Sequence, residues 1–134
     1  MATGIIRTAI YNKYVANTSL PLYIDIGTKF YYDEADKEVV APYCVFHIFD
    51  EIYDFTFDLE FEECLVQFDY YGKTANECDD GVIDIKALFD YAALSITGYT
   101  FLKLERQLVI PASKVEPDDL WVGVVRYELL MKKT

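Results

Sequence analysis

The stretch VQFDYYGKTANE, residues 66–77, decides the fold, because the hydrophobic period changes within it. Before Gly72 the apolar residues alternate with more polar ones, which is typical of a half-buried strand. The inward positions of this strand are Cys64, Val66, Phe68 and Tyr70. After Gly72 the period becomes helical over about 75–94, and Ser95–Gly98 ends the pattern. The helical stripe consists of Val82, Ile85, Leu88, Phe89 and Ala92.

The start of this helix has two candidate positions. Thr74 or Asn76 is a suitable N-cap directly after the strand. Gly81 inside a helix costs about 1 kcal/mol relative to alanine, so Asp79 or Asp80 is the alternative start.

The residues before this stretch predict further strands. Residues 42–50, PYCVFHIFD, read as a strand that begins after a proline. The next segment, DFTFDLEF, alternates strictly, with Phe55, Phe57, Leu59 and Phe61 on one face. The inward set then changes from odd to even numbers across Glu62 and Glu63, which predicts a bulge or a tight turn there.

The two ends of the chain complete an α+β pattern. Residues 3–17 form an amphipathic helix, 22–26 are ambiguous between extended chain and a helical turn, and 99–111 and 120–132 are strands. In the first of these strands Leu102, Leu104, Leu108 and Ile110 are predicted to share a face. The whole chain, 1–134, is predicted to form a single domain: a mostly antiparallel β-sheet with two helices packed on one face. Six residues are predicted to be in its core: Phe57, Leu59, Phe68, Leu88, Phe89 and Tyr127.

Two short strings imitate nucleotide-binding motifs. The letters DEAD, residues 33–36, lie in a polar turn between two apolar segments, with an extra hairpin there as an alternative. The letters GKT, residues 72–74, lack the glycine-rich loop that would wrap a phosphate, because Gln67 and bulky residues precede them. In P-loop enzymes the acidic motif follows the loop, whereas here it comes first. The sequence therefore predicts no nucleotide-binding site.

Other catalytic or metal chemistry has little support. The three cysteines have no C-x-x-C spacing, and Cys44 and Cys64 lie in apolar strands where a buried thiol is usual. A dyad of cysteine with His47, the only histidine, stays open at this level. We predict no catalytic residue, no cofactor and no metal site. An odd number of cysteines without a signal peptide favours a reducing cytoplasm, and no apolar run is long enough for a membrane span.

The negative charge is confined to one region. The chain has a formal net charge of −11, which disfavours direct nucleic-acid binding. Between Asp50 and Asp90 there are thirteen acidic residues and two lysines, and the remainder of the chain is balanced. The region is either a solvated face or an acidic surface for a partner or a pore. The candidate surface residues are Asp54, Asp58, Glu60, Glu62, Glu63 and Asp69.

Five stretches carry a resemblance to a known family: IIRTAIYNKY (5–14), APYCVFHI (41–48), VQFDYYGKTANE (66–77), ERQLVIP (105–111) and LWVGVVRYELLM (120–131). In their order along the chain and their general residue pattern, they resemble the tail terminator, or tail-completion, proteins of long-tailed bacteriophages. The resemblance covers nearly the whole chain. The resemblance implies a structural protein without catalysis. Members form a ring, usually a hexamer, that caps the tail tube, ends its polymerisation and presents a surface for head–tail joining.

The resemblance also implies partners and a location. The partners would be further copies of the chain, the tail-tube protein and a head-completion protein, while DNA passes through the ring without specific binding. The protein would reside in the bacterial host cytoplasm during assembly and then in the virion tail. The twelve tyrosines exceed what one small core needs and fit subunit contacts. Basic candidates for these contacts are Arg106, Arg126, Lys132 and Lys133.

Three alternatives remain open from the sequence. A related phage neck protein, a head–tail connector, has a similar small α+β fold. An acidic DNA mimic could present spaced carboxylates in place of phosphates and inhibit a DNA-binding protein. A small hydrolase that uses a cysteine or a carboxylate pair ranks last.

Overall fold

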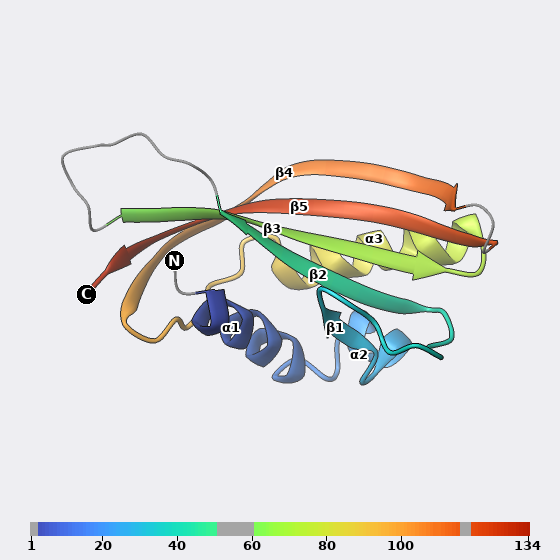
Figure 1. Ribbon diagram of the computed structural model, residues 1–134, viewed down its shortest axis with the longest axis horizontal. Coiled ribbons are helices and arrows are strands. Elements are labelled where there is room, and N and C mark those ends of the chain that lie inside the picture. The colour runs from blue at the N-terminus through green and yellow to red at the C-terminus, as the bar shows by residue number, and fades with distance from the viewer. Residues whose placement is uncertain (1–2, 51–60, 116–118) are drawn as a thin grey trace.

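The computed structural model describes residues 3–50, 61–115 and 119–134. Its elements are α1 (Thr3–Val15), α2 (Pro21–Ile26), β1 (Phe30–Tyr32), β2 (Tyr43–Asp50), β3 (Phe61–Gly72), α3 (Ala75–Phe89), β4 (Tyr99–Val115) and β5 (Leu120–Lys133). The five described strands form one sheet in the order β1-β2-β3-β5-β4, and every neighbouring pair except β1–β2 is antiparallel (Figure 1). The predicted α+β class is confirmed.

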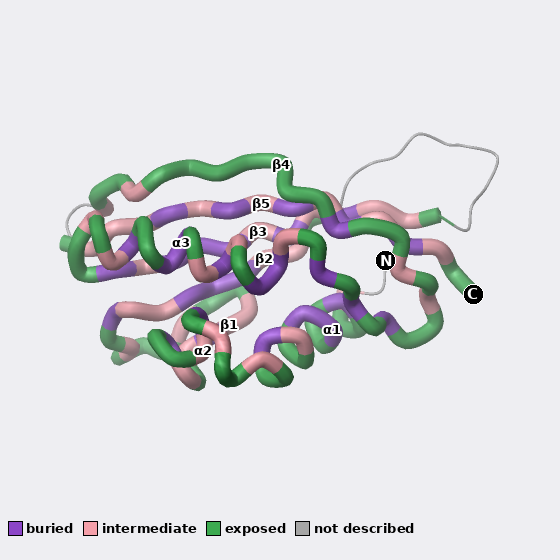
Figure 2. The backbone as a smooth tube through the Cα atoms, turned by 180° about the vertical axis from the view of Figure 1, so that it is seen from behind, coloured by how far each residue is buried: buried purple, intermediate pink, exposed green. Residues whose placement is uncertain are grey.

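The hydrophobic core lies between the sheet and the helices. Buried positions alternate along β3 and β5, and they face the buried stripes of α1 and α3 (Figure 2). Phe68 is fully buried at the centre, where its ring stacks on Phe89 at 4.4 Å and meets the edge of the Tyr127 ring. Four of the predicted core residues are therefore confirmed as buried: Phe68, Leu88, Phe89 and Tyr127. The other two, Phe57 and Leu59, lie outside the described residues.

Helix α3 begins at Ala75, because Thr74 caps it. The Thr74 hydroxyl accepts a hydrogen bond from the backbone N–H of Glu77 at 3.1 Å, while the Glu77 carboxylate accepts one from the N–H of Lys73. The later start at Asp79 or Asp80 is wrong.

Gly81 has a packing role inside α3. A Cβ atom there would lie 2.1 Å from the ring of Tyr70, so only glycine allows the helix to approach β3 this closely. The helix also ends at Phe89, earlier than the predicted residue 94. Asp90 is extended, and the chain beyond it continues without helix to Gly98.

The N-terminal part forms two helices and a short strand. The predicted apolar stripe of α1 is buried through Ile6, Ala9, Ile10 and Tyr14. The ambiguous segment 22–26 belongs to the one-and-a-half-turn helix α2. Strand β1 pairs in parallel with β2, so the DEAD segment is a connection between them and not the turn of an extra hairpin.

Two predictions about register need correction. Strand β3 pairs with β5 without interruption from Phe61 onward, so no bulge or turn lies at Glu62–Glu63. Three register shifts occur instead in β4, between residues 101 and 103, 106 and 108, and 110 and 113. Each extra residue reverses the side-chain parity. For this reason Leu104 faces the core opposite Leu129, whereas Leu108 lies opposite Arg126 on the other face.

Candidate functional site

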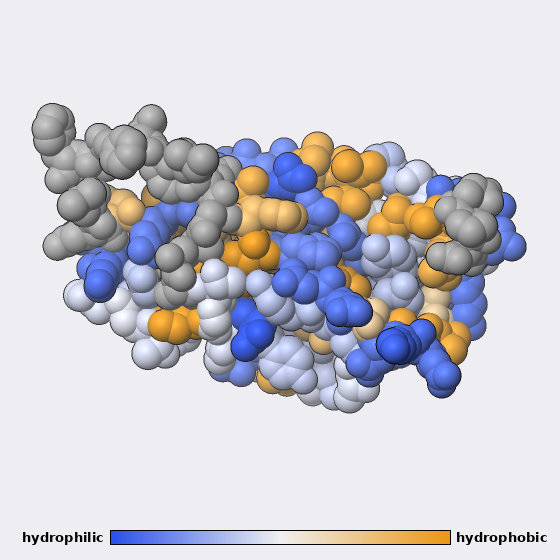
Figure 3. Space-filling model, in the orientation of Figure 1, coloured by the Kyte–Doolittle hydropathy of each residue, from blue (hydrophilic) through white to orange (hydrophobic). Residues whose placement is uncertain are grey.

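One face of the sheet has no described helix packed on it. Helix α3 lies behind the strands and α1 lies beside β2, which leaves the front of the sheet open in the orientation of Figure 1. We call this the open face. Its side chains come from the strand positions that alternate with the core positions, principally Val45, His47, Leu65, Gln67, Asp69, Val124, Arg126 and Glu128. Figure 3 shows hydrophilic side chains across the middle of this face, with hydrophobic ones on either side.

A chain of polar contacts crosses the open face. His47 lies between two carboxylates, with Nδ1 3.2 Å from Asp33 Oδ1 and Nε2 3.1 Å from Asp69 Oδ2. Gln67 donates to the other oxygen of Asp69 at 2.9 Å and accepts from Arg126 Nη2 at 2.7 Å. The contacts link Asp33, which follows β1, to β2, β3 and β5 in one network, which restrains these side chains. The same network occupies both nitrogens of the only histidine.

The predicted acidic surface does not form one patch where the structure describes it. Three of its candidates lie outside the described residues: Asp54, Asp58 and Glu60. On β3 the alternation places Glu63 and Asp69 on the open face and Glu62 on the opposite side. Oε2 of Glu62 is buried and has no hydrogen-bond partner among the described residues. The described acidic residues of this set are therefore divided between the two faces of the sheet.

The four basic candidates are also dispersed. Arg106 is paired with Asp90 at 3.0 Å, and Arg126 is bonded to Gln67 on the open face. Lys132 lies over the ring of Phe61, with Nζ 5.6 Å from the ring centroid, and Lys133 is exposed at the end of β5. Within the chain, the two arginines thus already have partners.

The described cysteines do not form a nucleophilic site with His47. Cys44 and His47 point to opposite faces of β2 because they are three residues apart on one strand. Burial raises the pKa of the Cys44 thiol well above its usual value, with a smaller contribution from the charge of Asp69. Burial also raises the pKa of Cys78 to about 12. A thiol with a raised pKa is a poor nucleophile at neutral pH. Among residues 3–50, 61–115 and 119–134, no group of three side chains could hold a metal ion.

Two carboxyl groups meet between α2 and α3. Burial raises the pKa of Asp84 to about 7, and a hydrogen bond and the charge of Asp25 act in the same direction, with a smaller effect from Asp80. One proton shared by this pair removes the repulsion between the two carboxylates. The pair thus makes the contact between the two helices sensitive to pH.

The β4 edge exposes several large apolar side chains. We use this term for the strand β4 together with Tyr91, which lies beside Leu104, Glu105 and Arg106. β4 is the last strand in the order of the described sheet, so among the described strands it pairs with β5 alone. Four large apolar side chains are exposed along it: Leu102, Leu108, Val109 and Ile110. Figure 3 shows hydrophobic side chains along this margin of the molecule.

Tyr91 was not identified from the sequence. It lies between Phe89 and Ala92 of the predicted apolar stripe, so the pattern places it inside the helix. In the structure it lies past the helix end, completely exposed and at a φ of 60°. The number of tyrosines is the only sequence feature that indicated exposed aromatic contacts of this kind.

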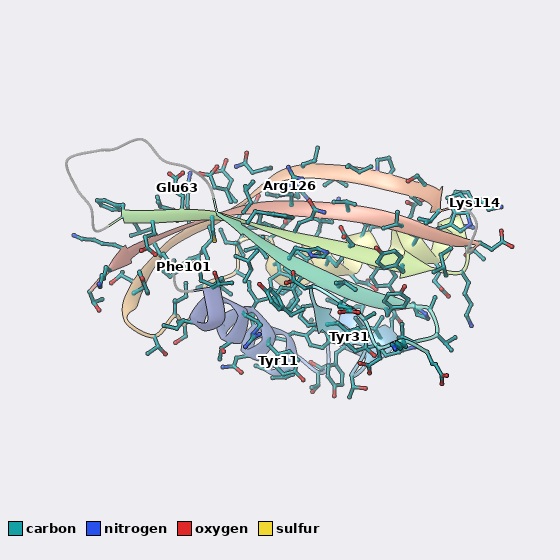
Figure 4. The ribbon with its side chains drawn as sticks, viewed as in Figure 1. Tyr11, Tyr31, Glu63, Phe101, Lys114 and Arg126 are labelled. Carbon is teal, nitrogen blue, oxygen red and sulfur yellow. The ribbon has the colours of Figure 1, made fainter. Side chains whose placement is uncertain are left out.

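The opposite margin of the sheet carries a hollow between α1 and β1, which we call the α1–β1 hollow. It has a volume of about 410 Å³ and is lined mainly by aromatic rings, among them Tyr11, Phe30, Tyr31 and Tyr32. Arg7 lies 5.2 Å from the centroid of the Tyr32 ring, a cation–π distance. Figure 4 shows Tyr11 and Tyr31 on this side of the molecule and Lys114 on the β4 side.

Comparison with known proteins gives a fold likeness. One similar solved structure is a chain in the virion of a native gene transfer agent particle, with a TM-score of 0.81 and 14% identity over 97% of this chain and 96% of that chain. A second solved structure, of a protein without a descriptive name, has a TM-score of 0.60 and 10% identity over 100% of this chain and 96% of its own. No family model and no curated protein matches. The fold is therefore one that occurs in a virion particle.

No helix in the described ranges has both the length and the apolar character that a membrane crossing requires.

Proposed function

We propose that the chain is a structural, non-enzymatic component of a phage-like virion. More specifically, it is a subunit of a ring that caps the tail tube, ends tube polymerisation and presents a surface for head–tail joining. The observation that carries this proposal is the likeness, over nearly the full length of both chains, to a chain of a gene transfer agent virion. The resemblance of the sequence to tail terminator proteins supports the position at the end of the tail.

The described surfaces support assembly over catalysis. The histidine is held by two carboxylates, the cysteines are buried, and the GKT residues cap a helix. By contrast, the molecule presents an unpaired apolar strand edge and a largely uncovered sheet face, which are features that subunit contacts use.

The test combines oligomeric state with tube capping. The purified chain is imaged by electron microscopy, alone and mixed with tail tubes assembled from a purified phage tail-tube protein. We expect rings, with six as the expected subunit number, and added chain should stop the elongation of tubes at one end. A chain that forms no ring in either setting and leaves tube growth unchanged contradicts the proposal.

A DNA mimic is the principal rival and predicts a different result. Such a protein would remain a monomer or dimer and would inhibit a DNA-binding protein. The division of the described β3 acids between two faces argues against it, because a phosphate imitation needs its carboxylates on one surface. A head–tail connector would form a ring but would bind the portal side of the neck and leave tube length unchanged.

A further inference from the structure

We propose that neighbouring subunits join head to tail, with Tyr91 and the β4 edge of one copy docked against the α1–β1 hollow of the next copy. This inference rests on the proposed ring and names the two surfaces that would form it. The occupant of the hollow is the Tyr91 side chain of a second copy of the chain.

Tyr91 is held in a position suited to reach into a neighbour. Its side chain is 100% exposed, and its φ of 60° is a conformation that residues other than glycine rarely adopt. The preceding residue is fixed, because the Asp90 carboxylate accepts hydrogen bonds from the Tyr127 hydroxyl at 2.7 Å and from Arg106 at 3.0 Å. The backbone at Tyr91 is thus held beside a fixed Asp90, and a tyrosine side chain has only two χ angles to order on binding, which is one reason tyrosine is favoured as an interface anchor.

The α1–β1 hollow has the size and lining that such an anchor requires. Its volume of about 410 Å³ exceeds that of one tyrosine side chain, and its walls are the rings of Tyr11, Tyr31 and Tyr32 with the guanidinium of Arg7. Aromatic rings pack favourably against one another, and the exposed Tyr11 at the rim would be covered by the incoming ring. The apolar side chains at 108–110 would be buried beside it by the same contact.

The two segments that would meet carry opposite formal charge. Strand β4 carries three basic residues and one acidic residue: Lys103, Arg106, Lys114 and Glu105. Each basic side chain also has an acidic partner within its own chain, Lys103 with Glu105 and Glu128, Arg106 with Asp90 and Lys114 with Asp119, yet stays more than a third exposed. The segment 30–38, which forms β1 and the loop after it, carries four acidic residues and one lysine: Asp33, Glu34, Asp36, Glu38 and Lys37. A contact between two β4 edges would bring like charges together, whereas a contact from β4 to β1 pairs opposite charges.

The position of the two surfaces favours a closed assembly. They lie at opposite ends of the strand order β1-β2-β3-β5-β4, so each copy can use one for the copy before it and the other for the copy after it. A heterologous contact of this kind produces a ring when the rotation closes and a filament when it does not. The acidic DEAD loop thereby gains a role as the charged rim of a subunit contact.

Charge reversal provides the sharpest test. The β4 variant carries Lys103→Glu and Lys114→Glu, and the loop variant carries Glu34→Lys and Glu38→Lys. In either variant alone, both surfaces of the contact have the same sign. The protein concentration needed for half-maximal ring formation should therefore rise roughly tenfold or more. When the two variants are mixed, every contact again joins opposite charges, and alternating rings should form. A β4–β4 contact predicts instead that the loop variant alone associates as the wild type does, because its β4 edge is unchanged.

A second variant tests the anchor. Tyr91→Gly removes the ring and also relieves the positive φ, so it should leave thermal stability unchanged or raised while ring formation weakens roughly tenfold or more. Ile24→Ala, at an exposed apolar residue on α2, is the control and should leave the ring intact.

The outcomes separate this inference from the proposed function. Ring formation by the wild-type chain is measured first, alone and on tail tubes, and the variants are compared in whichever setting forms rings. If all variants form rings as the wild type does, the contact lies elsewhere and the inference is overturned, while the proposed ring stands. If the wild type forms rings in neither setting, the proposed function fails, and the inference fails with it.

Discussion

Replacing Gly81 by alanine should destabilise the protein, although helix propensity predicts the reverse. Gly81 lies inside α3, where alanine is favoured over glycine by about 1 kcal/mol. However, the added Cβ would lie 2.1–2.3 Å from three ring atoms of Tyr70, and this ring is itself only 1% exposed. Overpacking of a core costs about 1–3 kcal/mol, and contacts this short belong at the upper end, so we expect a net loss of about 1–2 kcal/mol. Urea unfolding followed by circular dichroism measures the difference.

Two companion variants make this result decisive. Gly4→Ala in α1 has nothing within 4 Å of the new Cβ and should be neutral or stabilising. In a Tyr70→Leu background the penalty of Gly81→Ala should shrink, because the ring that the Cβ meets is gone. If Gly81→Ala stabilises the chain as Gly4→Ala does, or if the Tyr70→Leu background leaves its effect unchanged, then the close packing of α3 on β3 is wrong.

Three further predictions concern the core, a titrating pair and the GKT string. Phe68→Ala should lower the free energy of unfolding by about 3–5 kcal/mol in the same urea assay, since the ring is fully buried, and a loss below about 1 kcal/mol would contradict the packing. The folded-state pKa of Asp84 is raised from 3.8 to about 7, so the folded chain binds the extra proton in that window and stability falls as pH rises through it. Asp84→Asn should flatten this fall between about pH 4 and pH 7, and an unchanged pH profile would refute the shared proton with Asp25. Neither the wild type nor Lys73→Ala should hydrolyse ATP. ATP turnover in the wild type that this variant abolishes would be inconsistent with a plain helix cap at GKT.

The sequence predicted those parts of the fold that local patterns specify. The buried positions of β3 and α3 follow from periods of two and 3.6, and both patterns are contained within single elements. The parallel pairing of β1 with β2 and the register shifts in β4 depend on partners distant in the chain, so no local pattern reports them. Gly81 was misread for the same reason. Helix propensity treats glycine as a helix breaker, whereas this position requires glycine because the ring of Tyr70 on β3 packs against it.

The candidate site was harder to predict than the fold. A run of acidic residues in the sequence suggested one charged surface, but alternation along a strand sends neighbours such as Glu62 and Glu63 to opposite faces. The basic candidates Arg106 and Arg126 were likewise selected by charge alone, and their internal partners become visible only when Asp90 and Gln67 are placed beside them.

The irregularities of β4 explain how an exposed apolar edge can persist on a folded chain. A long regular edge strand is a template for indiscriminate pairing through its free N–H and C=O groups. In β4 three register shifts interrupt the edge, and Asp79 accepts a hydrogen bond from the N–H of Ala112 and so occupies one edge donor. Such bulges increase local twist and disfavour extended strand-to-strand pairing. The apolar side chains of β4 are thereby left available for a contact that is selected by shape and charge, such as the docking of Tyr91 in a neighbouring copy, instead of by backbone pairing with any other strand.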